Sequence, residues 1–153
     1  MIPVQRLNHA VLYVRDAAVS AAWYQEHLGF EVVEQMSGAA FLRCGGTANH
    51  HDLGLFSVGP DAPGPERGRV GLYHLAWEVP SVHDLTVARD LLRRIGAYTG
   101  ESDHGVSKSI YAHDPDGNEF EILWAVPPAQ WGEYAEHAVV QPLDLAAELE
   151  RHG

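Results

Sequence analysis

The sequence repeats one pattern on either side of a loop rich in proline and glycine, and this internal repeat restricts the fold more than any other feature. The loop, residues 58–69, reads VGPDAPGPERGR and contains three prolines and three glycines. Each half begins with an apolar run, continues with a helical segment and ends in three further segments of strand length. Because a repeated unit of this kind folds as one supersecondary element, we predict two similar βαβββ modules joined by the loop.

The first half starts with LNHAVLYV, residues 7–14, an extended and largely buried run with β-branched and aromatic residues. Asp16 is placed to cap a helix that continues to about His27, and Gly29 is placed to end it. Strands are expected next at residues 30–36, 39–44 and 51–57.

The second half repeats this order from LYHLAWEV, residues 72–79. Ser81 and Asp84 resemble a capping box for a helix ending near Ile95. Strands are expected at about 97–100, 107–113 and 119–125. We therefore predict an α+β fold with a first module at 1–57, a linker at 58–69, a second module at 70–126 and a C-terminal tail at 127–153 that contains a short helix.

The composition restricts the compartment and the partners. A formal net charge of −11 argues against a nucleic-acid partner, which normally requires a basic face. No run approaches the 18 or so apolar residues of a membrane span, and the first residues lack the apolar stretch of a signal peptide. The single cysteine, Cys44, suits a reducing compartment. We expect a cytoplasmic protein that binds neither nucleic acid nor membrane.

Three polar side chains on the expected strands are candidate metal ligands. His9 and His74 are each the third residue of the first strand of their half, and Glu121 lies on the last strand. If the two halves lie side by side as curved sheets, these three side chains can meet in one cavity. Two neutral imidazoles and one carboxylate suit non-haem Fe(II) and leave coordination positions open.

The charge of Glu121 needs an explanation, because its sequence neighbours Phe120 and Ile122 are apolar. Burial alone would raise the pKa of such a carboxyl group, whereas a bound divalent cation favours the charged form. The alternative is that Glu121 faces water on a half-exposed strand. Likewise, either histidine taken alone is more often a structural residue than a ligand.

Three segments make the sequence resemble a known superfamily: LNHAVLYVRD, GLYHLAWEV and YAHDPDGNEFEI. They resemble the vicinal oxygen chelate superfamily, which includes glyoxalase I, bleomycin-resistance proteins and the type I extradiol dioxygenases, and the resemblance covers about residues 5–125. It implies paired βαβββ modules that form a curved, partly closed mixed sheet around a metal cavity. The ligands would be His9, His74 and Glu121.

The details resemble the catechol 2,3-dioxygenase-like members most. Glyoxalase I has a further glutamate ligand on the last strand of its first module, where Gly54 aligns here. In the dioxygenases, residues matching His51, His104 and Tyr111 act on the substrate and on oxygen. The resemblance thus implies that His51 stabilises developing negative charge and donates a proton, that His104 relays the phenolic proton, and that Tyr111 orients the substrate.

Each of these roles has an alternative. His51 could belong to a solvated loop pair with His50, His104 could be a plain loop residue, and Tyr111 could serve core packing. We expect an extradiol ring-cleaving dioxygenase that uses Fe(II), with Mn(II) or another divalent metal as alternatives, and acts on a small aromatic diol and O2. The other hypotheses are a lyase, isomerase or epimerase of the same fold and a non-catalytic resistance-type binding protein. A homodimer is expected, because two-module members often pair.

Overall fold

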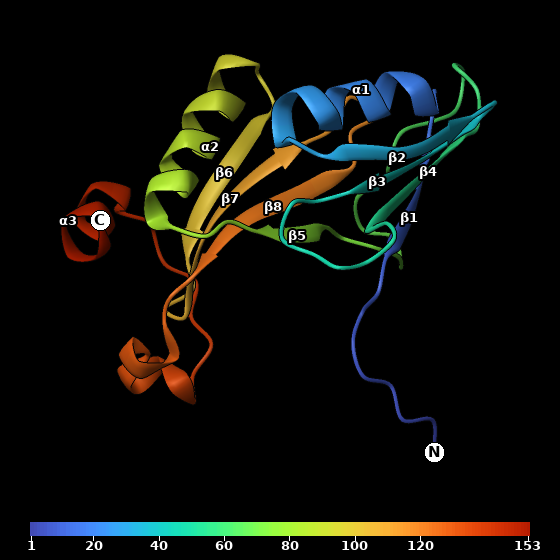
Figure 1. Ribbon diagram of the computed structural model, residues 1–153. Coiled ribbons are helices and arrows are strands. Elements are labelled where there is room, and N and C mark those ends of the chain that lie inside the picture. The colour runs from blue at the N-terminus through green and yellow to red at the C-terminus, as the bar shows by residue number, and fades with distance from the viewer. The chain divides into compact units, whose positions relative to one another are not determined.

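The computed structural model describes residues 1–153, and the chain divides into two compact units, Met1–Pro65 (unit 1) and Glu66–Gly153 (unit 2). Each unit contains one four-stranded mixed sheet with a helix packed on it (Figure 1). The predicted α+β fold with two βαβββ modules is confirmed. The strands are divided between two sheets, neither of which closes into a barrel.

Unit 1 contains five elements: β1 (Ala10–Val14), α1 (Ala17–Leu28), β2 (Glu31–Met36), β3 (Ala39–Arg43) and β4 (Leu53–Ser57). The strand order is β1-β4-β3-β2, with β1 and β4 parallel and the other pairs antiparallel. As predicted, the Asp16 side chain caps α1 by accepting hydrogen bonds from two backbone N–H groups of its first turn. Gly29 ends the helix with φ of 69°, a left-handed conformation that favours glycine.

Unit 2 repeats this order with β5 (Leu75–Glu78), α2 (Val82–Arg94), β6 (Tyr98–Asp103), β7 (Ser107–His113) and β8 (Glu119–Ala125). The strand order is β5-β8-β7-β6. The tail, residues 127–153, follows with two 3₁₀ turns, η1 (Pro128–Gln130) and η2 (Gly132–Ala135), and the helix α3 (Leu145–His152). Ser81 caps α2 as predicted, accepting from Asp84 N at 3.1 Å.

The two sheets have the same register. Val11 on β1 pairs with Gly54 on β4, and Ala76 on β5 pairs with Glu121 on β8. His9 and His74 stand two residues before Val11 and Ala76 respectively, so they occupy equivalent positions. Both precede their strands, which start at Ala10 and Leu75, because those residues are the first with partners in the parallel ladder. The predicted strands 7–14 and 72–79 therefore began too early.

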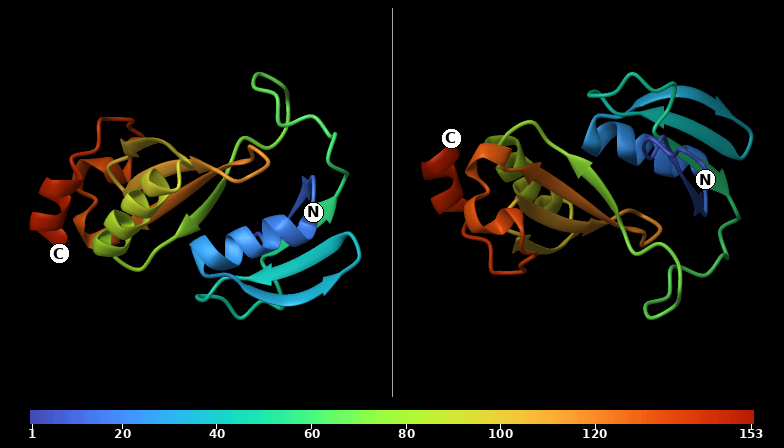
Figure 2. Two further views of the ribbon diagram at one scale, coloured as in Figure 1. Left: turned by 90° about the horizontal axis from the view of Figure 1, so that it is seen from above. Right: turned by 90° about the horizontal axis from the view of Figure 1, so that it is seen from below.

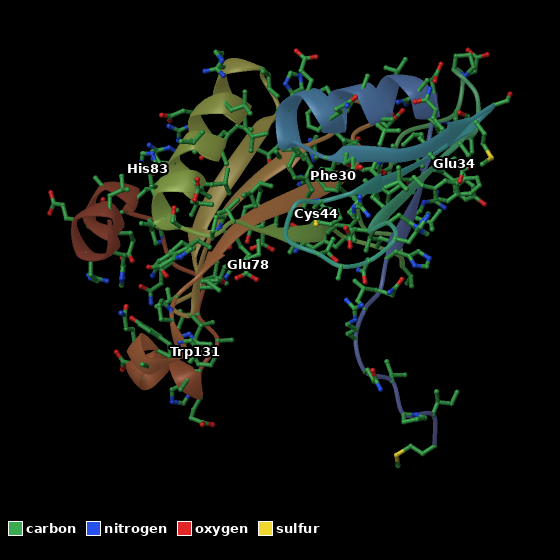
Figure 3. All side chains as sticks on the ribbon, in the orientation of Figure 1. Phe30, Glu34, Cys44, Glu78, His83 and Trp131 are labelled. Carbon is green, nitrogen blue, oxygen red and sulfur yellow. The ribbon has the colours of Figure 1, made fainter.

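The helices α1 and α2 each cover one face of their own sheet (Figure 2). In unit 1, Tyr24 of α1 is 1% exposed and stacks edge-on against Phe30, which follows the helix (Figure 3). In unit 2, Leu85 and Leu92 of α2 are fully buried over β7 and β8. The helices α2 and α3 also pack together. None of the helices combines the length and the apolar character needed to cross a membrane.

Candidate metal centre

The predicted residues of unit 2 lie on one face of its sheet. Glu121 on β8 pairs with Ala76 on one side and with Tyr111 of β7 on the other. His74, which precedes β5, places its Nε2 atom 3.1 Å from Glu121 Oε2. The His74 and Tyr111 rings are 5.8 Å apart between centroids. The hairpin of β7 and β8 thus brings Tyr111 beside Glu121.

The Glu121 carboxylate is buried with only 7% of the residue exposed, which excludes the alternative that it faces water. Its neighbours Phe120 and Ile122 are buried on the opposite face, next to α2. A buried carboxylate requires a charged or hydrogen-bonding partner. The partner that the structure provides is the imidazole of His74.

The donor atoms of this pair fit two adjacent positions around a divalent cation. Two ligands bound at right angles, each about 2.1 Å from the metal, are separated by roughly 3.0 Å. The measured 3.1 Å between His74 Nε2 and Glu121 Oε2 agrees with that spacing. His74 Nδ1 is buried without a hydrogen-bond partner, and the nearest acid is Glu119, whose Oε1 lies 3.8 Å away.

Tyr111 and His104 form a second polar pair on this unit. The Tyr111 hydroxyl lies 2.7 Å from His104 Nε2, and His104 Nδ1 lies 3.0 Å from the backbone oxygen of Val139 in the tail. Burial and the nearby charge of Glu121 raise the pKa of Tyr111 above its ordinary value of 10.0. Tyr111 is therefore a neutral phenol at neutral pH. The contact brings the two predicted residues together, and their catalytic roles stay predictions.

In unit 1, His9 lies beside His51. Their ring centroids are 4.7 Å apart, and His9 Nδ1 is 2.8 Å from the side-chain oxygen of Asn8. His51 also contacts the Phe41 ring and has its Nδ1 3.1 Å from His50 Nδ1. Burial, together with the charges of His9 and His50, lowers the pKa of His51 below 6.5. His51 is thus a neutral imidazole at neutral pH.

Unit 1 has no counterpart of Glu121. Gly54 occupies the equivalent place, and a Cβ atom there would be in ordinary contact with Val11 at 3.4 Å. The nearest acid in sequence, Asp52, is buried and accepts hydrogen bonds from the Asn49 amide and from Cys44 N. Its carboxylate is therefore engaged in holding the loop before β4. The additional glutamate ligand of glyoxalase I is absent, as predicted.

The three predicted ligands come from both units. His74 and Glu121 belong to unit 2 and contact each other, whereas His9 belongs to unit 1. No three histidine, cysteine, aspartate or glutamate side chains are grouped closely enough within either unit to hold a metal ion. One cation bound by all three residues stays a prediction.

Two contributors escaped the sequence analysis. Glu119 lies near His74, and its signal was available, because residues two apart on a strand share a face with Glu121. Val139 contributes only a main-chain oxygen to His104, and a backbone carbonyl has no signature in the sequence.

Comparison with known proteins identifies the family. Residues 6–122 match the Glyoxalase/Bleomycin resistance protein/Dioxygenase superfamily, so the chain belongs to that superfamily, as the resemblance predicted. A Bacillus subtilis (strain 168) catechol-2,3-dioxygenase is 32% identical over 82% of this chain and 43% of its own length. A Rhodococcus globerulus biphenyl-2,3-diol 1,2-dioxygenase 3 is 36% identical over 80% of this chain and 64% of its own length. A manganese-dependent 2,3-dihydroxybiphenyl 1,2-dioxygenase of Geobacillus genomosp. 3 is 28% identical over 80% of this chain and 38% of its own length.

The chain therefore spans between about two fifths and two thirds of the length of these relatives. Two solved structures match this chain over nearly their whole length. A glyoxylase/bleomycin resistance protein/dioxygenase domain from Frankia sp. EAN1pec superimposes with a TM-score of 0.66 at 23% identity, covering 82% of this chain and 95% of that one. A lactoylglutathione lyase from Agrobacterium tumefaciens superimposes with a TM-score of 0.60 at 23% identity, covering 80% of this chain and 96% of that one. At this identity the similarity establishes the fold.

Proposed function

We propose that this chain is a metal-dependent extradiol dioxygenase that cleaves a catechol-type aromatic diol with O2. The observation that carries the proposal is the 3.1 Å approach of His74 Nε2 to Glu121 Oε2 on the sheet face where Tyr111 and His104 meet. A ligand pair next to an acid–base pair is what diol activation requires. The names of the relatives support the same reaction class.

The metal would be held by His9, His74 and Glu121. Fe(II) is the ion that a set of two histidines and one carboxylate suits, and Mn(II) is the alternative that one relative's name supports. When bound, the cation supplies a Lewis acid that lowers the pKa of the diol hydroxyl groups. The carboxylate of Glu121 balances part of the cation's charge in a buried environment.

The acid–base groups divide the proton transfers between them. Tyr111, kept protonated by its raised pKa, accepts a hydrogen bond from the substrate hydroxyl and so orients it, while its own proton points to His104 Nε2. His104 Nε2 receives the phenolic proton through the Tyr111 hydroxyl: Tyr111 passes its own proton to Nε2 and takes the substrate proton in its place. His51 is neutral, because its pKa is lowered, so it must accept a proton before it can donate one to the product.

The open sheet face of unit 1 supports an aromatic substrate. Val11 and Tyr13 of β1 and Phe56 of β4 line a hollow there. Val11 and Tyr13 share the strand face of His9, because side chains two residues apart point the same way. An apolar wall beside a candidate ligand suits the ring of a diol.

The proposal is tested by anaerobic purification and reconstitution with Fe(II) or Mn(II), followed by oxygen-uptake measurements against catechols and 2,3-dihydroxybiphenyl. We expect one metal ion per chain, stoichiometric oxygen consumption and a yellow ring-fission product. Glu121→Gln should lose most of the bound metal and the turnover with it. The matched control is Glu34→Gln, an exposed position on β2 (Figure 3), which should retain both.

Two results would contradict the proposal. Full metal content in Glu121→Gln protein would remove the ligand role of that carboxylate. Conversion of a substrate under argon, without oxygen uptake by any diol, would instead indicate a lyase or isomerase.

A further inference from the structure

The tail contacts the proposed acid–base pair through its main chain. His104 Nδ1 lies 3.0 Å from the carbonyl oxygen of Val139, and a carbonyl oxygen only accepts hydrogen bonds. Nδ1 must therefore carry a proton. In a neutral imidazole the other nitrogen, Nε2, is then an acceptor, and it faces the Tyr111 hydroxyl at 2.7 Å. The direction of the pair is thus set, with Tyr111 donating to His104.

We propose that the tail is part of the catalytic site and that the Val139 carbonyl is a positioning group that holds His104 as its Nδ1–H tautomer. This inference rests on the proposed function, in which His104 Nε2 receives the phenolic proton. If the tail were displaced, neither the orientation of the ring nor its protonated nitrogen would be defined by the protein. The tail would then set the competence of a residue that lies 35 positions earlier in the sequence.

Two contacts close to His104 hold the tail at this place. Asp103 and Gln141 exchange both backbone hydrogen bonds at 2.9 Å, which forms a short antiparallel bridge two residues beyond Val139. Tyr134 packs directly on Gly105, which is buried with φ of 74°. A Cβ atom at Gly105 would stand 2.5 Å from Tyr134 Cγ, so only glycine permits this approach. Both residues that flank His104 are therefore in contact with the tail.

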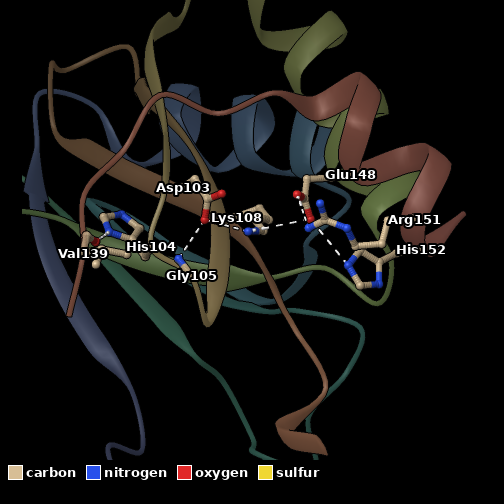
Figure 4. A network of polar contacts seen from close by, with 8 residues as sticks. All are labelled: Asp103, His104, Gly105, Lys108, Val139, Glu148, Arg151 and His152. Atoms are coloured by element: carbon tan, nitrogen blue, oxygen red, sulfur yellow. Dashed lines mark hydrogen bonds and ion pairs between the residues drawn. The ribbon is translucent and has the colours of Figure 1, made fainter. Parts of the chain in front are cut away.

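A network of buried charges connects α3, at the end of the tail, to the sheet of unit 2 (Figure 4). Lys108 of β7 is 4% exposed, and its Nζ atom lies 2.6 Å from Asp103 Oδ1 and 3.6 Å from Glu148 Oε2 of α3. Glu148, itself 5% exposed, also meets Arg151 at 3.0 Å and His152 at 3.5 Å. The same Asp103 oxygen accepts the Gly105 N–H at 2.7 Å. Because buried charges are costly to separate, this network fixes α3 against the strands that flank His104.

The experiment determines the tautomer directly in metal-free protein that comprises residues 1–153. Histidine is labelled with ¹⁵N, and long-range ¹H–¹⁵N spectra at pH 8 distinguish protonated from unprotonated ring nitrogens. We expect a protonated Nδ1 and an unprotonated Nε2 for His104. In Gly105→Ala, which forces Tyr134 away, and in Glu148→Gln, which weakens the network, the signal should become a mixture of both tautomers.

The kinetic readout uses the same variants after metal reconstitution. We expect kcat to fall about tenfold to a hundredfold. The metal content and KM should stay at their wild-type values. The matched control is Glu150→Gln, an exposed position on α3, which should leave tautomer and kcat at their wild-type values.

The outcomes separate the two proposals. An Nε2–H tautomer in the wild-type protein, or a pure Nδ1–H signal in both tail variants, would overturn the positioning role of the tail. A wild-type Nδ1–H tautomer that the tail variants disturb, in a protein that cleaves no diol, would leave the positioning role standing and remove the proposed function.

Discussion

Glu121 is a charged residue on a strand whose neighbouring side chains are apolar and buried. The structure explains it by a partner, since His74 Nε2 lies 3.1 Å from its carboxylate. On the equivalent strand of unit 1, Gly54 takes this place, and no acid is present there to form a similar pair. The two modules thus share a backbone register but differ at the position of the proposed metal ligand.

Also at the residue scale, we predict that His51 titrates below 6.5 in the metal-free protein. Burial and the neighbouring His9 and His50 disfavour its charged form. Because the unfolded chain then binds the proton at a higher pH than the folded one, His51 contributes stability above pH 6.5 that is lost on acidification through its folded pKa. An NMR titration, assigned with His51→Gln, checks the value, and a midpoint at or above 6.5 would contradict it.

At the scale of elements, the helices α1 and α2 are stabilised by local caps that the sequence predicts. Asp16 and Ser81 each accept backbone N–H groups of the first turn, and Gly29 provides the left-handed conformation that ends α1. These caps matter for the site because α1 and α2 cover the sheet faces opposite to it.

We predict that Ser81→Ala lowers the free energy of unfolding by about 1 kcal/mol. The substitution removes the oxygen that accepts the Asp84 N–H and leaves that donor without its cap. Urea unfolding followed by circular dichroism measures the change. Ser37→Ala, at an exposed turn between β2 and β3, is the control and should change stability by less than about 0.5 kcal/mol. Equal effects of both substitutions would be incompatible with a specific cap.

At the scale of the whole molecule, the proposed metal requires a ligand from each unit. His9 lies in unit 1, and the His74–Glu121 pair lies in unit 2. A ligand that binds only the folded state stabilises it by mass action. Metal binding should therefore be visible as a stability gain that depends on residues of both units.

We predict that Fe(II) or Mn(II) at about a hundred times its Kd raises the Tm of the wild-type protein by about 5 to 10 °C. His9→Ala and Glu121→Gln should each abolish most of this shift, although they lie in different units. His83→Ala, an exposed histidine on α2, is the control and should keep it. A full shift in His9→Ala protein would mean that unit 1 contributes no ligand.

The sequence by itself determined what depends on local patterns. The repeat predicted two βαβββ modules, the caps at Asp16 and Ser81 located the helices, and the strand pattern placed Glu121 on the last strand. These features rest on interactions between residues close in the chain, where spacing alone defines geometry. The strand starts were less accurate, because a strand begins where its partner begins, and the partner of Ala10 is the distant Leu53.

Only the tertiary structure decided the contacts between distant segments. It showed that the Val139 carbonyl reaches His104, that Glu148 of α3 joins Lys108 of β7, and that Glu121 is buried against His74. The physical reason is that such contacts depend on how separate elements pack, and a main-chain oxygen or a buried ion pair has no local pattern to reveal it. The tail, for which the sequence predicted only a short helix, contacts the predicted site residue His104 through Val139.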